Sequence, residues 1–455
     1  MRTARSVFCR LVGIGMLAVL IGTPYLTGGS PSFAALAVDV DLTKPVNITF
    51  WHIYSAGDAQ ALTGLIGLFH KKYPTIAINA QFVAGYGQLH QKIVAALQAN
   101  QPPNIALAYE NDVVEYSKSG QVVDLTPYSA SPQNGLDKAS LADIIPIELY
   151  RNTYRALGTR YYSWPWTAAV AVMYYNKAML AKVGTQTPPA TWEAFTKTCE
   201  ALKKQLGKAC YAIAIDASTF NDVGFSYGGR ILQPGGKATD FGSSAWTATL
   251  RLHRLLVDQG YGYPTTGRAE IAFADQQDFA NQQVAFIIRT SRSIPYVKQI
   301  VGTQFDWGVA IPPRAEWVGH PVTVLYGPNV TVFKGSPEQQ LASWLFARFA
   351  SSAEGQAYWA THTGNLPTRL STAKQDEYRQ FLQKEPRFKA AFDALPYGQF
   401  EGLVYDRQLV AVLPTRLRTL IEDTETALLT KAIGVSEAQA RLKDQGNQIV
   451  SDATK

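Results

Sequence analysis

Residues 46–83 carry two kinds of apolar periodicity in succession, and this order constrains the fold more than any other feature of the chain. At each end, apolar side chains alternate at the period of a β-strand, as at Val46, Ile48 and Phe50. Between these ends they recur at the spacing of an amphipathic helix, at Leu62, Leu65, Ile66 and Phe69. A strand, a helix and a second strand in direct succession indicate an α/β domain.

The first 37 residues have the pattern of an export signal. Three arginines precede an apolar run over residues 11–25, and a small-x-small cleavage site ends at Ala37. We expect residues 1–37 to be a signal peptide and the mature, exported chain to start near Val38, in the periplasm or on the outer face of the cytoplasmic membrane. The alternative is a retained membrane anchor, but the apolar run is shorter than the roughly 20 residues that span a bilayer.

The remaining chain is longer than the ~250–300 residues that one hydrophobic core usually supports, which favours two domains. The formal charge of +7 falls when the signal and its three arginines are removed, and no basic run is interleaved with aromatics, so we expect no nucleic-acid partner. The six histidines never fall at metal-ligand spacing. We therefore expect neither a metal nor a cofactor.

Cys199 and Cys210 are the two cysteines that remain after cleavage. Thr191 can cap a helix from Trp192 to about Gln205 that carries Cys199 on its apolar face, while Cys210 opens a strand packed against that face. An oxidising compartment favours a disulfide between them. The alternative is two buried thiols, because free cysteine behaves as a small hydrophobe.

The α/β alternation continues along the chain and indicates a doubly wound sheet. The apolar run over residues 161–175 contains Pro165, and a proline in so long a strand indicates an edge or a crossing between domains. Further on, Ser336 and Gln339 form a capping box at the start of a helix, and Ser351 with Glu354 repeats the pattern.

Residues 224–228 match the G-x-S-x-G motif of secreted serine esterases, with Ser226 as the nucleophile. That motif needs an apolar strand before it and a helix after it, whereas residues 216–222 are polar and glycines follow. A glycosidase would need two paired carboxylates, and no such pair is evident. We therefore expect a protein without enzymatic activity.

Several segments together resemble the extracellular solute-binding proteins of ABC importers, in their carbohydrate-type group. They include ITFWHIY near the start, SWPW followed by VMYYNKAML, FDWGVAIPP, and SPEQQLASWLFARFASSAEGQAYWATHTGNLPTR. The resemblance implies a two-lobed periplasmic-binding-protein fold of type II, similar to maltose-binding protein, with the ligand in a cleft between the lobes. It places lobe 1 at residues 38–164 and 327–362, and lobe 2 at residues 165–326 and 365–455.

Within the group, the resemblance is greatest to the members that bind glycerol 3-phosphate, and it implies a set of site residues. Tyr86 and Glu110 are expected to face the cleft, Glu110 as an acceptor for ligand hydroxyls. Trp192 is expected to provide a stacking wall, Thr290 a hydroxyl and Gly327 a backbone amide. The alternative for Tyr86 and Glu110 is an ordinary loop tyrosine and a solvated acid.

The expected phosphate contacts are incomplete. Arg418 stands where the family places its phosphate-binding guanidinium, a planar fork suited to two phosphate oxygens. Ala169 and Asn365, however, replace a serine and a tyrosine that bind phosphate in the family. Other arginines could compensate, namely Arg289, Arg292 and Arg416. The plainer interpretation of Arg418 is an exposed helix face with ion pairs to Glu422 or Asp423.

From the resemblance we expect the ligand to be glycerol 3-phosphate or a glycerophosphodiester, and the alternative is an uncharged sugar or oligosaccharide. A diester carries less charge and suits the loss of two hydroxyl contacts. The implied partner is an ABC permease in the membrane, and we expect the protein itself to be a monomer.

Overall fold

The computed structural model describes residues 38–154, 157–265, 273–401 and 412–453. The predicted signal peptide, residues 1–37, lies outside the described residues. Within the described ranges, no helix is long and apolar enough to cross a membrane.

The first of two large sheets has five strands in the order β2-β1-β3-β13-β6. They are β2 (Ile76–Phe82), β1 (Val46–His52), β3 (Ile105–Ala108), β13 (Asn329–Val332) and β6 (Trp164–Pro165). β1 runs parallel to β2 and β3, and β13 is antiparallel to β3 and β6. The helix between β1 and β2 is α1 (Ala56–Lys72), which confirms the strand, helix and strand predicted from residues 46–83.

The second large sheet has seven strands, with β7 (Ala169–Asn176) at its centre. The order is β14 (Gly398–Phe400), β12 (Thr323–Tyr326), β7, β10 (Phe286–Thr290), β8 (Tyr211–Ile213) and β9 (Gly262–Pro264), with β11 (Trp307–Ala310) also paired to β7. The side chains of β7 alternate between two buried apolar clusters, one on each face of the sheet. A strand buried on both faces explains the continuous apolar run in the sequence.

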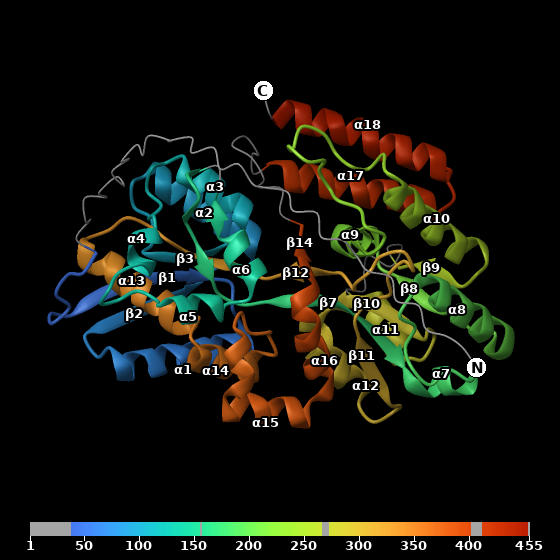
Figure 1. The fold of residues 1–455 in the computed structure, drawn as a ribbon, viewed down its shortest axis with the longest axis horizontal. Coiled ribbons are helices and arrows are strands. Elements are labelled where there is room, and N and C mark those ends of the chain that lie inside the picture. The colour runs from blue at the N-terminus through green and yellow to red at the C-terminus, as the bar shows by residue number, and fades with distance from the viewer. Residues whose placement is uncertain (1–37, 155–156, 266–272, 402–411, 454–455) are drawn as a thin grey trace, which may run out of the picture. The chain divides into compact units, whose positions relative to one another are not determined.

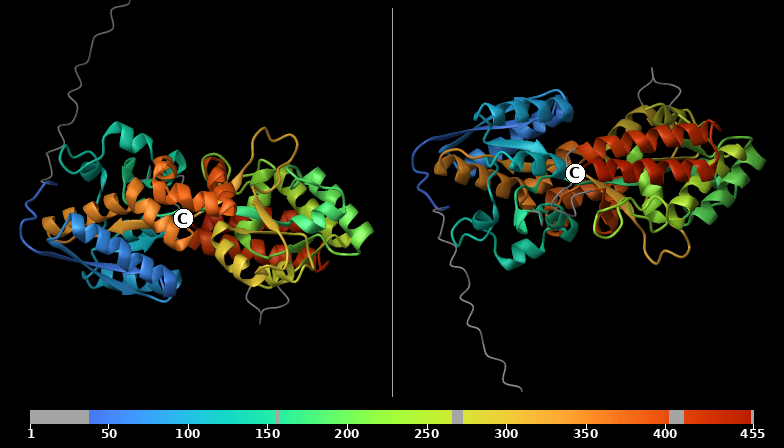
Figure 2. Two further views of the ribbon diagram at one scale, coloured as in Figure 1. Left: turned by 90° about the horizontal axis from the view of Figure 1, so that it is seen from below. Right: turned by 90° about the horizontal axis from the view of Figure 1, so that it is seen from above.

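Helices cover both sheets (Figures 1 and 2). Those on the first sheet include α2 (Tyr86–Gln98), α3 (Glu110–Ser117), α13 (Pro337–Ala350) and α14 (Ala353–Thr363). Those on the second include α8 (Trp192–Leu206), α9 (Ala217–Ser226), α10 (Ser244–Asp258), α16 (Pro386–Ala394), α17 (Val412–Leu429) and α18 (Val435–Ala453). The pair α17 and α18, red in Figure 1, packs against α9 and α10.

The chain passes directly between the two sheets at two places. Residues 166–168 connect β6 to β7, and residues 327–328 connect β12 to β13; we call these the two crossings. Pro165 lies in β6 at the edge of the first sheet, where a missing N–H costs no ladder hydrogen bond. Leu366, which follows α14, contacts the first crossing through two backbone hydrogen bonds with Ala168.

Three local predictions can be compared with the structure at the residue level. Cys199 on α8 and Cys210 beside β8 form a disulfide, with Cα atoms 5.0 Å apart, as predicted. Ser336 caps α13 and shares a capping box with Gln339, also as predicted. The second predicted capping box, of Ser351 with Glu354, is wrong: Ser352 caps α14 by accepting from the Gly355 N–H, and a glycine at that position has no side chain to complete a box.

Candidate ligand-binding site

A cavity of about 700 Å³ lies where the carboxyl ends of strands from both sheets meet. In open α/β sheets this edge is the usual place for a ligand. The residues that follow β1 and β3 line it from the first sheet, and those that end β10, begin α9 or lie on α17 line it from the second. The two crossings run along it, through Thr167, Gly327 and Pro328.

Seven of the eight predicted site residues line this cavity, although they come from distant parts of the chain. They are Tyr86, Glu110, Ala169, Thr290, Gly327, Asn365 and Arg418. The Asn365 side chain donates to the hydroxyl of Thr363 at 2.7 Å, so part of its hydrogen-bonding capacity is used within the protein.

Trp192 does not line the cavity, so the prediction that it provides a stacking wall for the ligand is wrong. Its side chain is buried in the core of the second sheet, against Phe195 and Tyr227. The indole N–H donates to the Ser226 hydroxyl at 2.8 Å. Trp192 begins the amphipathic helix α8, and the apolar face of that helix points to the sheet, which explains why the ring faces inward.

Ser226, the serine of the G-x-S-x-G sequence, is also buried and ends α9. Its hydroxyl donates to the carbonyl of Val223 at 2.6 Å and accepts from Trp192. A nucleophile elbow requires an exposed serine on a strand-to-helix turn. This serine instead supports the packing of a tryptophan.

Tyrosine side chains form one wall of the cavity. The rings of Tyr86 and Tyr109 lie 4.7 Å apart, and the Tyr54 hydroxyl accepts from the Trp166 indole N–H at 2.7 Å. Burial raises the pKa of all three tyrosines, so each remains a neutral phenol. Such a wall combines apolar faces with hydroxyl groups, which suits a ligand that has both C–H and O–H groups.

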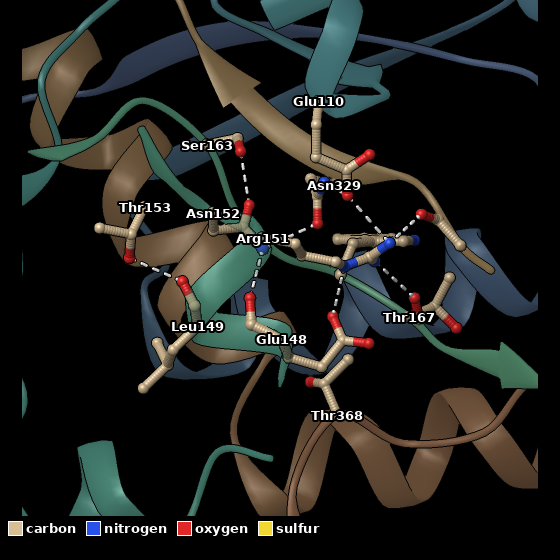
Figure 3. Close-up of polar contacts among 12 residues, drawn as sticks. Glu110, Glu148, Leu149, Arg151, Asn152, Thr153, Ser163, Thr167, Asn329 and Thr368 are labelled. Atoms are coloured by element: carbon tan, nitrogen blue, oxygen red, sulfur yellow. Dashed lines mark hydrogen bonds and ion pairs between the residues drawn. The ribbon is translucent and has the colours of Figure 1, made fainter. Parts of the chain in front are cut away.

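Glu110 on the same side is held by an arginine that the sequence did not single out (Figure 3). Arg151 lies 3.1 Å from Glu110 and 2.9 Å from Glu148, and its side chain is only 1% exposed. Asn329 donates to Glu110 at 3.0 Å. Burial raises the pKa of Glu148 to about 7, against the opposing effect of Arg151.

Arg418 lies at the other side of the cavity and is already surrounded by acceptors. It donates to the Ser218 hydroxyl at 2.7 Å and lies 3.3 Å from Asp216, 3.4 Å from Glu401 and 3.9 Å from Glu422. The Glu422 contact is the i,i+4 pair that the plainer interpretation named. Burial raises the pKa of Glu401, although Arg418 opposes this shift.

The three arginines offered as compensating phosphate donors are also paired. Arg289 forms a bidentate pair with Asp275, at 2.6 and 2.7 Å, and Arg292 binds Asp58 at 2.8 Å. Both line the cavity. Arg416 does not line it and pairs with Asp452 at 3.3 Å.

The sequence reasoning missed Arg151 and the polar start of α9. Asp216 caps α9 by accepting from the N–H groups of Ser218 and Thr219, and this turn places Asp216, Ser218 and Asn221 on the cavity. Asp216 followed by apolar residues at Phe220 and Val223 is a recognisable helix start, although residues 216–222 are mostly polar. Glu148 lies three residues before Arg151 in the same helix, but its other partners, Glu110, Thr167 and Gly327, come from three other segments that the local sequence does not indicate.

Among the described residues, no group of three or more histidines, cysteines and acids is arranged to hold a metal ion. The described lining of the cavity consists of hydrogen-bond donors and acceptors, ion-paired arginines and carboxylates, and aromatic faces.

Residues 65–390 match the family of bacterial extracellular solute-binding proteins. The chain belongs to that family. Its members are binding proteins for transport rather than enzymes, and membership makes this chain the solute-binding component of an ABC importer.

Individual relatives agree with the family assignment. The sn-glycerol-3-phosphate-binding periplasmic protein UgpB of Brucella abortus is 22% identical over 82% of this chain and 85% of its own length. The sugar-binding protein MalE of Xanthomonas citri has a TM-score of 0.77 at 19% identity, covering 90% of this chain and 98% of its own. UgpB of Mycobacterium tuberculosis in complex with glycerophosphocholine has a TM-score of 0.73 at 22% identity, with the same coverage. These structural likenesses confirm the predicted two-lobed, maltose-binding-protein-like fold.

Proposed function

We propose that this protein is exported, binds an uncharged polyhydroxylated ligand such as a sugar or oligosaccharide in its cavity, and delivers it to an ABC permease. The observation that carries the ligand class is that each arginine lining the cavity in the described part of the chain is already paired with a carboxylate; these arginines are Arg151, Arg289, Arg292 and Arg418. A sugar needs no net positive charge, only donors, acceptors and apolar faces in fixed positions.

The charge balance supports this choice. Among the described residues, the four arginines that line the cavity are matched by four lining carboxylates, which are Asp58, Glu110, Asp216 and Glu401. Three further acids, Glu148, Asp275 and Glu422, pair with the same arginines from just outside the cavity. A phosphate dianion would enter a site in which acids outnumber arginines, and like charges in a desolvated site cost several kcal/mol.

The cavity size and its walls fit the same class. About 700 Å³ lies within the range of roughly 300–1,000 Å³ that is usual for small-molecule sites. Tyr54, Tyr86 and Tyr109 would contact the C–H faces of a sugar ring, while Glu110 and Asn111 would bind its hydroxyls. We assign the residues that follow β1 and β3 to lobe 1 and those of β10, α9 and α17 to lobe 2, and lobe closure would bury the ligand between them.

A glycerol phosphate or glycerophosphodiester is the second candidate. Arg418 lines the cavity, and the two UgpB proteins have names that state glycerol phosphate or glycerophosphocholine binding. For this ligand, the guanidinium of Arg418 would have to leave Glu401 and Asp216, or Glu401 would have to take up a proton. Ala169 and Asn365 would supply none of the family's phosphate hydroxyl contacts.

Calorimetric titration of the mature protein decides between the candidates. Maltose, tagatose, glycerol 3-phosphate and glycerophosphocholine are titrated into wild type, Arg418→Ala and a control, Arg416→Ala, whose ion pair lies outside the cavity. For a neutral ligand we expect Arg418→Ala to change the affinity by less than about fivefold, roughly 1 kcal/mol.

A different result would overturn the neutral-ligand proposal. If wild type binds a phosphorylated compound best and Arg418→Ala loses about 30-fold or more, equal to about 2 kcal/mol, the phosphate candidate replaces it. Arg416→Ala should match wild type in both cases.

Export, monomeric state and absence of catalysis belong to the same proposal. N-terminal sequencing of the secreted protein should find Val38 or a neighbouring residue first, and light scattering should give the mass of one chain. Ser226→Ala should leave any esterase signal of the preparation unchanged, and loss of such a signal would contradict the assignment.

A further inference from the structure

A buried polar network connects the cavity to both crossings. Its central residue is Arg151 at the end of α6 (Pro146–Arg151), and we call the group Glu148, Arg151, Asn152, Ser163 and Asn329 the crossing network (Figure 3). All five are buried, and only Arg151 lines the cavity. Of their buried side-chain polar atoms, only Glu148 Oε1 has no hydrogen-bond partner. A buried network that is largely hydrogen-bonded usually specifies one arrangement of the segments that it joins.

Arg151 binds the backbone of both crossings. Its Nη1 donates to the carbonyl of Gly327 at 2.8 Å, and its Nη2 donates to the carbonyl of Thr167 at 3.5 Å. The nitrogen that binds Gly327 also lies 3.1 Å from Glu110. One side chain therefore contacts a carboxylate in the cavity and a peptide group in each crossing.

A second chain of hydrogen bonds runs beside the first. Asn329, which directly follows one crossing, donates to Glu110 at 3.0 Å and accepts from Asn152 at 2.9 Å. Asn152 in turn accepts from Ser163, which lies just before the other crossing. Glu110 is thus connected to both crossings through Arg151, and to residues that flank them through Asn329 and Asn152.

The crossings touch each other at the point where Arg151 binds them. Gly327 has a φ of +130°, and a Cβ placed there would lie 2.1 Å from the Thr167 carbonyl oxygen. Only glycine permits this contact and this conformation. A change in one crossing must therefore move the other or break their contacts with Arg151.

We propose that Arg151 is a positioning residue that couples Glu110 to the two crossings, so that ligand contact at Glu110 and the orientation of the crossings change together. The proposal rests on the proposed function in two respects, that the ligand touches Glu110 and that the lobes close around it. The planar fork of arginine is essential, because a lysine has a single charged centre and cannot bind two carboxylates and two carbonyls in these directions.

The test compares Arg151→Lys with a matched control, Arg348→Lys. Arg348 also lies on the first-sheet side and binds two backbone carbonyls, those of Asn134 and Gly135, but it does not line the cavity or contact a crossing. Each mature protein is measured by calorimetry with the best wild-type ligand of the panel, and by small-angle X-ray scattering with and without that ligand. Melting temperatures report the general loss of stability in each variant.

We expect Arg151→Lys to lower the affinity by about tenfold, a typical coupling between linked sites, and to abolish the ligand-induced change in radius of gyration. Arg348→Lys should keep the affinity within about twofold of wild type and retain the ligand-induced change in radius of gyration. This should hold even if its melting temperature falls as much as that of Arg151→Lys. Equal behaviour of the two variants would overturn the proposal.

Hydrogen exchange on the wild-type protein gives a test that does not depend on a variant folding. Ligand should slow exchange at residues 146–152, 164–168 and 327–330 together, although most of residues 146–152 lie outside the cavity. Slower exchange at the cavity residues without residues 146–152 would contradict the coupling.

The failure of the proposed function is recognised separately. If wild type binds no member of the panel, the ligand class is wrong, and scattering of the unliganded proteins still tests the network. Arg151→Lys should then differ from wild type in radius of gyration and Arg348→Lys should not, and an unchanged Arg151→Lys would overturn the role of Arg151.

Discussion

Arg151 and Arg418 are the same residue type at opposite sides of one cavity, yet their surroundings differ. The Arg151 side chain is 1% exposed and binds two carboxylates and the backbone of both crossings. The Arg418 side chain is 38% exposed, and its contacts are side chains on α9, on α17 and at Glu401. Arg151 therefore joins buried segments of the backbone, whereas Arg418 binds only side chains and is partly open to solvent.

Both arginines carry the same charge and both line the cavity, so it is the burial of Arg151 that distinguishes it from the more exposed Arg418. Removing one partner of a buried ion pair leaves an uncompensated charge in a low dielectric, while an exposed partner is solvated by water. A sequence pattern that identifies an arginine cannot distinguish these two cases.

The largest expected effect is on the free energy of unfolding, and its absence would contradict the difference between Arg151 and Arg418. Arg151→Met should lower the free energy of unfolding by about 3–5 kcal/mol, because Glu110 and Glu148 lose their shared cation inside the protein. Arg418→Met should cost no more than about 1 kcal/mol, since the side chains of Asp216, Glu401 and Glu422 are 35%, 23% and 39% exposed. Urea unfolding followed by tryptophan fluorescence measures both, and equal losses would refute the distinction.

A second expected effect concerns the carboxylates beside the two arginines. Glu110→Gln should weaken binding of a polyhydroxylated ligand about tenfold, because a hydrogen bond to a charged acceptor contributes about 1.5–3 kcal/mol. Glu401→Gln should weaken it less than about threefold, since its oxygens already accept from Ser218 and Asn221, and an amide oxygen can replace one of them. Calorimetry of the two variants gives the order, and a larger loss for Glu401→Gln would move the main ligand contact to the Arg418 side.

The pH dependence of stability sharpens the comparison further. Burial raises the pKa of Asp222, near the Arg418 side, to about 7, and its carboxylate accepts from the Val324 N–H at 2.7 Å. The folded protein therefore holds a proton that the unfolded chain releases above about pH 4. This contribution to stability is complete below the unfolded pKa and is lost as the pH rises through about 7.

Melting temperatures between pH 5 and pH 8 test this assignment. Wild type should become less stable across that window as Asp222 ionises, and Asp222→Asn, which cannot ionise, should show a flatter profile. Glu148→Gln should flatten the profile in the same direction, because burial also raises the pKa of Glu148 to about 7. A profile that Asp222→Asn leaves unchanged would show that Asp222 is already ionised throughout.

The smallest expected effect is at the ion pair between Asp58 and Arg292, which joins the start of α1 to the segment after β10. Its side chains are 22% and 38% exposed, so Asp58→Asn should lower the free energy of unfolding by only about 0.2–1 kcal/mol. The same urea experiment measures it. A loss as large as that of Arg151→Met would mean that this pair, too, is part of the scaffold.

Much of the fold could be predicted from the sequence because its determinants are local. The strand, helix and strand of residues 46–83, the capping box at Ser336 and the disulfide between Cys199 and Cys210 each follow from side chains close together in the sequence. Periodicity and capping are properties of one segment, and they survive whatever that segment packs against. The Ser352 cap shows the limit, since two adjacent serines can both serve and packing selects one.

The positions of seven candidate residues on one cavity were also predicted, through resemblance to a family rather than through any local pattern. What only the tertiary structure decided is the environment of each. Trp192 faces the core, Arg418 is surrounded by Asp216, Glu401 and Glu422, and Arg151 binds two crossings that are 160 positions apart in the sequence. Burial and ion pairing depend on distances between segments that are remote along the chain, and such distances exist only after the chain has folded.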